Sequence, residues 1–187
     1  MDIKKLIQVV FFVLKRNNCK LNYMKLIKLL YLSDRLSLDK CGESITENDA
    51  VSMDNGPVLV ELYDFIKNKQ NNQLQDEWNR YFKTENYDLI CINTDINADE
   101  ICEFEQNILT EIEAKYHDKS VWEIVSLVHS PEVCPEWKDP NGSSIPIRRN
   151  ELLSSLGYTP EERSYLMDNE ESYKQEDKKF SKVCLCR

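Results

Sequence analysis

Few residues of this chain have types and spacings suited to nucleophilic or acid–base chemistry. Of the two histidines, His117 lies in a polar turn, where we expect it to be exposed. His129 precedes Cys134 by five positions. A histidine beside a thiol can form a nucleophile–base pair, and both can bind a metal, but no third residue at a suitable spacing completes either site. We therefore expect His129 to interact with the last carbonyls and the dipole at a helix C-terminus.

Paired carboxylates could also supply acid–base catalysis. Glu161 is adjacent to Glu162, as Glu170 is to Glu171. Neighbouring residues on a helix point in different directions, so these are expected to be surface charges. The chain has only four glycines, and it contains no phosphate-binding loop, nucleophile elbow, zinc-protease motif or dinucleotide fingerprint. The sequence therefore predicts no enzyme, with no catalytic, cofactor-binding or metal-binding residues.

The cysteines indicate a reducing compartment. There are seven, an odd number, and none forms a C-x-x-C pair. Neither a disulfide framework nor a zinc ribbon is indicated, and most are expected to act as small apolar residues. No apolar run approaches the roughly 18–20 residues of a membrane span, and no signal peptide is recognised. We therefore predict a cytoplasmic protein without a membrane partner.

Charge is distributed unevenly along the 187 residues, whose formal net charge is −9. Residues 1–28 carry seven basic residues against one acid, whereas residues 95–118 carry eight acids against one lysine. Both segments are typical of solvated helix faces. Alternatively, the acidic face attracts a basic partner by electrostatic steering. The candidate partner-binding residues are Asp99, Glu100, Glu103 and Glu111.

The same charge balance bears on nucleic acids. A negative net charge argues against nucleic-acid binding by the chain as a whole, because phosphate contacts dominate such binding. A local basic surface formed by residues 4–35 could still bind nucleic acid. In that case Lys25, Lys28 or Arg35 would set the salt dependence of binding.

The elements that must position these residues are mostly helices. Apolar residues at helical spacing predict a first helix that begins after Asp2 and ends at Asn17. Asn22 is expected to cap a second helix over about residues 23–39, which ends before Gly42. This helix is apolar nearly all round and should therefore lie in the middle of the core.

The middle of the chain predicts a small sheet. Residues 50–53 suit a short strand, and residues 54–57 suit a turn in which Pro57 starts the next helix. Residues 78–82 and 87–92 predict a β-hairpin, to which residues 50–53 would add a third strand.

The second half is expected to be helical again. Asn97 and Glu100 form a cap pair for a helix over residues 97–116, and Ser120 begins an S-x-x-E capping box. Four prolines make residues 129–147 irregular. A short helix then ends at Gly157. Thr159, Pro160 and Glu162 open a last helix, whose polar end over residues 170–182 should fray. We predict an α+β fold, mainly α-helical, with a small antiparallel sheet. Its domain would span residues 1–157, followed by a C-terminal helix and polar tail over 158–187.

Several motifs together resemble the Panacea (SocA-like) domain family. Residues 25–35 match its opening K-L-x-K-L-L-Y helix. Then follow a G…I turn at Gly42 and Ile45, an x-x-G-P-V segment over 53–58 and an E-L-Y helix at 61–63. Further matches are His129-Ser130, a P-x-W loop at 135–137 and an I-P pattern at 144–147. The resemblance extends over about residues 5–155.

The resemblance implies a function by binding. Members of this family are best known as antitoxins that are encoded beside a toxin gene and neutralise the toxin protein by direct contact. Some of them deliver the toxin to an ATP-dependent protease. No catalytic residue is implied. We expect the motif residues to be structural, with the Trp137 ring on the helices and its N–H bonded to a carbonyl. They are Leu26, Leu29, Leu30, Tyr31, Gly56, Pro57, Val58, Tyr63, His129 and Trp137.

Two functions follow from the sequence. The first is an antitoxin that binds its cognate toxin through the acidic helix or the hairpin edge, in a phage or prophage setting. The alternative is a winged-helix-like DNA-binding regulator of its own operon, suggested by helices followed by a hairpin and by the basic first residues.

Overall fold

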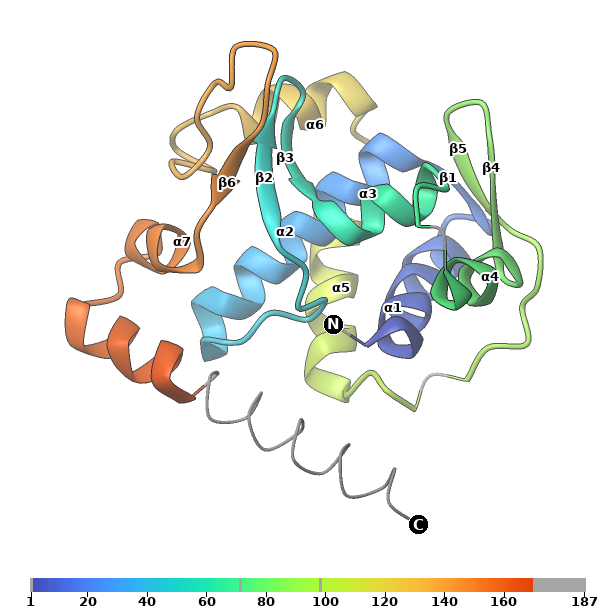
Figure 1. Ribbon diagram of the computed structural model, residues 1–187, viewed down its shortest axis with the longest axis horizontal. Coiled ribbons are helices and arrows are strands. Elements are labelled where there is room, and N and C mark those ends of the chain that lie inside the picture. The colour runs from blue at the N-terminus through green and yellow to red at the C-terminus, as the bar shows by residue number, and fades with distance from the viewer. Residues whose placement is uncertain (1, 71, 98, 170–187) are drawn as a thin grey trace. The chain divides into compact units, whose positions relative to one another are not determined.

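The fold is known from a computed structural model that describes residues 2–70, 72–97 and 99–169 (Figure 1). The chain divides into two compact units, residues 1–147 and residues 148–187. A boundary after residue 157 stays a prediction. The elements of the first unit are α1 (Ile3–Arg16), β1 (Lys20–Asn22), α2 (Tyr23–Cys41), β2 (Ala50–Met53), β3 (Gly56–Leu59), α3 (Val60–Ile66), α4 (Gln73–Asn79), β4 (Phe82–Glu85), β5 (Asp88–Cys91), α5 (Glu103–Tyr116), α6 (Val121–Val128) and β6 (Ile145–Ile147).

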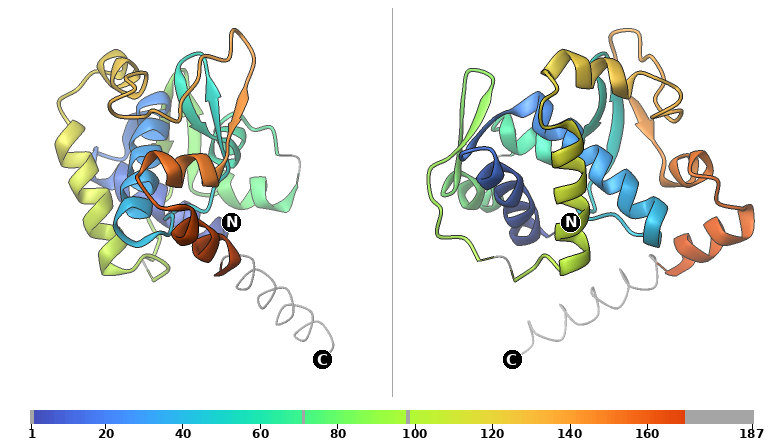
Figure 2. Two further views of the ribbon diagram at one scale, coloured as in Figure 1. Left: turned by 90° about the vertical axis from the view of Figure 1, so that its left-hand side faces the viewer. Right: turned by 180° about the vertical axis from the view of Figure 1, so that it is seen from behind.

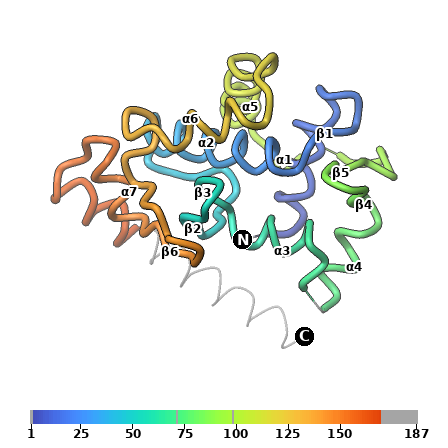
Figure 3. Tube along the Cα trace, turned by 90° about the horizontal axis from the view of Figure 1, so that it is seen from above, coloured from blue at the N-terminus to red at the C-terminus, as the bar shows by residue number. Residues whose placement is uncertain are grey.

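Helix α2 is the centre of the first unit. The side chain of Asn22 caps its start, accepting hydrogen bonds from the backbone N–H groups of Met24 and Lys25, and Gly42 ends it in a left-handed conformation. Most of its apolar residues are buried, as predicted for a helix in the middle of the core, and only Met24 and Leu36 are half-buried. Helix α5 packs along one side of α2, and β2 and β3 lie on the other (Figure 2 and Figure 3).

Helix α1 also begins where the sequence predicts. The carboxylate of Asp2 accepts a hydrogen bond from the backbone N–H of Lys4, 2.8 Å away, and the helix ends at Asn17. Most of its apolar residues are buried, so one face of α1 belongs to the core.

Two antiparallel three-stranded sheets flank these helices, with strand orders β1-β5-β4 and β3-β2-β6. The α+β, mainly helical class is therefore confirmed. The predicted third strand of the hairpin is wrong, because residues 50–53 pair with β3 and β6 instead. The strand that completes the hairpin is β1, three residues between α1 and α2 that are too short to give a sequence signal.

Pro57 does not start a helix, which corrects the sequence prediction. Gly56 adopts φ +95°, and the chain folds back so that residues 56–59 pair with β2. Pro57 lies in β3, an edge strand, where a residue without an N–H group is tolerated. Helix α3 begins only at Val60.

The hairpin exists but is displaced along the chain. Trp78 belongs to α4, which Asn72 caps. Its ring is stacked on Phe65 and tilted against Phe82, with centroid distances of 5.4 and 4.5 Å. The sequence placed Trp78 in a strand because aromatic residues are common in strands. Burial of its ring against Phe65 and Phe82 places it in a helix instead. The turn lies at Asn86, which adopts φ +54°.

Helix α5 begins six residues later than predicted. Its N-cap is Cys102, with Glu105 completing a capping box, and Asn97 lies outside the helix. Gln8 of α1 explains the difference, since its side chain binds both the carboxylate of Asp99 and the backbone N–H of Glu100. These contacts hold residues 99 and 100 in a turn before α5.

Later elements mostly agree with the sequence. Ser120 and Glu123 form the predicted capping box of α6. Residues 129–147 are not wholly irregular, however, because residues 145–147 form β6, which pairs with β2 on the side opposite β3. In the second unit, α7 (Arg149–Ser155) ends before Gly157. A reciprocal pair of hydrogen bonds between Thr159 and Glu162 opens a helix over residues 160–169. The predicted polar tail lies outside the described residues. None of the helices described here has both the length and the apolar character needed to cross a membrane.

Gly56 provides a test of this packing. A Cβ atom added at Gly56 would lie 2.6 Å from Cγ2 of Val128, whereas one added at Gly142, at φ +79°, would meet nothing within 4 Å. Both substitutions impose left-handed strain of about 1–2 kcal/mol, but only Gly56→Ala adds overpacking. We expect Gly56→Ala to lower the free energy of unfolding by about 3 kcal/mol and Gly142→Ala by about 1–2 kcal/mol. Chemical denaturation measures both, and equal losses would contradict a steric role for Gly56.

Candidate functional site

Lys28 is a lysine buried in the protein interior. It lies on the side of α2 that faces β3, and its side chain is 1% exposed. Its Nζ donates a hydrogen bond to the carbonyl of Pro57 at 2.6 Å. Burial lowers the pKa of this amine to about 7. Lys28 therefore connects α2 to the β2–β3 turn from inside.

A histidine–tryptophan pair lies on the other side of this turn. His129 follows α6, and its ring lies 4.2 Å from that of Trp137, measured between centroids. The indole N–H of Trp137 donates to the carbonyl of Met53 at 3.1 Å, which confirms the expected hydrogen bond. Burial and the nearby Lys28 lower the pKa of His129, so the imidazole is neutral at pH 7.

Cys134 is unsuited to be a nucleophile. Its side chain is buried, and burial together with Glu136 raises the pKa of the thiol to about 12. A thiol must lose its proton to attack or to bind a metal. The pair of His129 and Cys134 therefore lacks the ionisation that the sequence alternative requires.

Glu136 is a buried residue of this site that sequence reasoning did not single out. Its Oε1 accepts a hydrogen bond from the hydroxyl of Tyr31 at 2.6 Å and forms an ion pair with Nε of Arg35 at 3.1 Å. The carboxylate side chain is 0% exposed. The acidic character of the middle residue in P-x-W was the only signal in the sequence. Through Glu136, the loop at 135–137 is fixed to α2.

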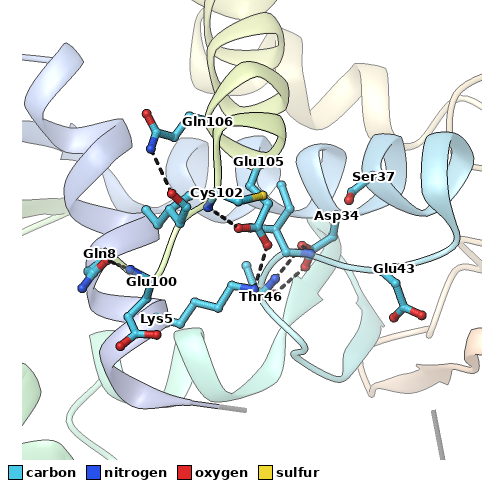
Figure 4. Close-up of polar contacts among 12 residues, drawn as sticks. Lys5, Gln8, Asp34, Ser37, Glu43, Thr46, Glu100, Cys102, Glu105 and Gln106 are labelled. Atoms are coloured by element: carbon cyan, nitrogen blue, oxygen red, sulfur yellow. Dashed lines mark hydrogen bonds and ion pairs between the residues drawn. The ribbon is translucent and has the colours of Figure 1, made fainter. Parts of the chain in front are cut away.

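Asp34 anchors the segment that follows α2. Its carboxylate accepts hydrogen bonds from the backbone N–H groups of Ile45 and Thr46, both at 2.9 Å, and bonds to the hydroxyl of Thr46 (Figure 4). Full burial raises its pKa to about 6, although these donors favour the ionised form. The G…I turn of the sequence is therefore held by a side chain inside the core.

Most motif residues of the sequence lie around this same helix. Leu26, Leu29, Leu30 and Tyr31 are buried in α2. Pro57 and Val58 follow the Gly56 turn in β3, whereas Tyr63 is half-buried on α3. Their positions agree with the expected structural role.

The acidic helix is less available to a partner than its sequence suggests. Glu105 pairs with Lys5 at 2.7 Å (Figure 4), and Glu111 pairs with Lys40 at 2.8 Å. Glu113 pairs with Arg16 at 3.3 Å. All four candidate residues are exposed. Glu111 is in an ion pair and the carboxylate of Asp99 accepts a hydrogen bond from Gln8, whereas Glu100 binds Gln8 only through its backbone N–H. The basic first helix and the acidic α5 partly neutralise each other.

Part of the proposed basic surface is internal, whereas Lys4, Lys15, Arg16 and Lys20 are exposed. Nζ of Lys25 donates to the carbonyls of His117 and Lys119, both at 2.7 Å, and closes the turn between α5 and α6. Lys25 is 8% exposed and Lys28 1% exposed. Neither ammonium group is accessible to a phosphate backbone.

The sequence model of a known family, described as antitoxin SocA-like with a Panacea domain, matches residues 26–138. The chain belongs to this family. Comparison with curated proteins and with solved structures gave no match. The matched range contains Lys28, Asp34, His129 and Glu136, so the Panacea signature coincides with the polar network around α2. Within the described part of the chain, no group of three or more His, Cys, Asp or Glu residues is placed to hold a metal ion.

Lys28 predicts a characteristic pH dependence of stability. Its pKa is 10.5 in the unfolded chain and about 7 in the folded protein, so the unfolded state binds more protons between these values. Its contribution to the free energy of unfolding therefore increases as the pH rises from about 7 to 10.5.

We expect wild type to gain about 3 kcal/mol in unfolding free energy relative to Lys28→Met when the pH rises from 7 to about 9.5. Denaturation curves at fixed pH values measure it, with the exposed Lys4→Met as control. A difference that does not vary with pH would show that Lys28 is not buried as described.

Proposed function

We propose that this protein neutralises a toxin by forming a stoichiometric complex with it. The observation that carries this proposal is the match of residues 26–138 to the antitoxin family. A general antitoxin role follows from the family. We infer in addition that the protein neutralises the toxin by binding to it and covering its surface.

The contacts of the ionisable residues in the signature support a function by binding a partner rather than by catalysing a reaction. Lys28 is bonded to a backbone carbonyl, Glu136 to Tyr31 and Arg35, and Asp34 to a loop backbone. The thiol of Cys134 is protonated. These groups fix the shape of the domain, and a shaped surface is what an inhibitor needs.

The DNA-binding alternative receives less support. It was suggested by helices followed by a hairpin and by the basic first residues. Of the three residues expected to set its salt dependence, Lys25 and Lys28 are buried and Arg35 is paired with Glu136. Delivery of the toxin to an ATP-dependent protease and a phage or prophage setting stay predictions.

Titration of the toxin encoded beside this gene distinguishes the mechanisms. We expect co-expression to restore growth and purified chains to inhibit the toxin fully only when at least one chain is present per toxin, because occlusion consumes one binder for each target. An inert control is Leu30→Asp, which places an unpaired carboxylate in the core and should unfold the domain. Full inhibition far below one chain per toxin would indicate catalysis and contradict the proposal. A retarded promoter fragment at low salt would favour the DNA-binding alternative.

A further inference from the structure

We propose that the toxin docks on the face formed by the start of α2, the β2–β3 turn and α3, where one large apolar side chain flanked by a carboxylate enters a pocket. This inference rests on the proposed function and names the surface that performs it. The pocket is lined by Tyr23, Met24, Ile27, Lys28, Met53, Asp54, Asn55, Val58 and Tyr63.

The size of the pocket favours a side chain over a metabolite. Its volume is about 190 Å³. Pockets for drug-sized ligands measure roughly 300–1,000 Å³. A cavity of about 150 Å³ suffices for a benzene ring. The space therefore fits a single aromatic or branched aliphatic group.

The lining is suited to a protein partner. Met24, Met53 and Tyr63 are all half-buried, so each presents part of its side chain to solvent. Tyrosine and methionine are enriched in the cores of protein interfaces, and the flexible thioether adapts to differently shaped partners. Nearby, Tyr87 is 66% exposed, and its ring lies 6.2 Å from that of Tyr23. These residues extend the apolar surface beyond the pocket itself.

Lys67 lies beside the pocket and indicates that the inserted side chain of the toxin is accompanied by a negative charge. Nζ of Lys67 lies 4.1 Å above the ring of Tyr23, donates to its hydroxyl at 2.6 Å and lies 5.7 Å from the ring of Tyr63. No carboxylate of the described residues forms an ion pair with Lys67, whereas the neighbouring Lys69 pairs with Asp64 at 3.6 Å. A carboxylate on the toxin beside the inserted side chain would complete this site.

The floor of the pocket is rigid before any partner binds. Lys28 fixes the carbonyl of Pro57, and the indole of Trp137 fixes that of Met53. Asp54 accepts a hydrogen bond from the backbone N–H of Gly142. A surface that is already ordered loses little conformational entropy on binding, which favours affinity.

The competing surface lies elsewhere. Helix α5 packs on the opposite side of α2 from β2 and β3 (Figure 3), and several of its acids are in ion pairs. An exposed residue on α5 is therefore a suitable control position. Phe104, which is 42% exposed, serves this purpose.

Two pocket variants and one matched control test the inference. The affinity of purified wild type, Met24→Glu, Lys67→Glu and Phe104→Glu for the toxin encoded beside this gene is measured by calorimetry, after circular dichroism and thermal melts have shown that each variant folds. We expect Met24→Glu and Lys67→Glu each to raise Kd about tenfold or more, and Phe104→Glu to leave it unchanged. A photoreactive amino acid at Asn55, which is exposed at the pocket, should cross-link to the toxin, whereas the same group at Phe104 should not.

The outcomes separate the two proposals. If wild type neutralises the toxin but both pocket variants bind it as tightly as wild type, or if only Phe104→Glu weakens binding, the docking face is wrong and the proposed function stands. If wild type neither binds nor neutralises the toxin, the proposed function fails and this inference fails with it. If sedimentation shows a dimer that the pocket variants dissociate, this face joins two copies of the chain, and the inference is overturned. Lys67→Glu keeps the test decisive if Met24→Glu does not fold.

Discussion

A helix that is buried on all sides can carry polar residues only if each of them finds a partner inside the protein. Helix α2 satisfies this constraint four times. Lys25 binds the turn between α5 and α6, Lys28 binds β3, Tyr31 binds the P-x-W loop, and Asp34 binds the segment after its own helix. Each contact fixes a different part of the domain to one central helix. The positions of the other elements depend on these contacts as much as on apolar packing.

The Panacea signature is therefore mainly a description of a scaffold. Its residues set the helix, the Gly56 turn and the Trp137 loop in place, and some of them, such as Val58 and Tyr63, also line the pocket on the proposed docking face. This scaffold role explains why the ionisable side chains Lys28, Asp34 and Glu136 within the signature are already bonded to the protein.

Local signals determined which elements the sequence could reveal. Asp2, Asn22 and Ser120 cap their helices as predicted, because a capping side chain bonds to backbone only two or three residues away. Errors arose where distant contacts decide: Gln8 shifts the start of α5, and aromatic packing places Trp78 in a helix. The docking pocket was not foreseen either, since its lining comes from three separate segments of the chain.

The partners of α2 also determine when the domain can form during synthesis. They lie between 11 and 105 residues further along the chain, from Ile45 to Glu136. Until these partners have been made, Lys25, Lys28, Tyr31 and Asp34 lack the contacts that they form in the folded domain. The helix reaches its final environment once Glu136 has been translated and has cleared the exit tunnel. Complete packing around α2 therefore requires the chain to have been made at least as far as Glu136, the most distant of these partners.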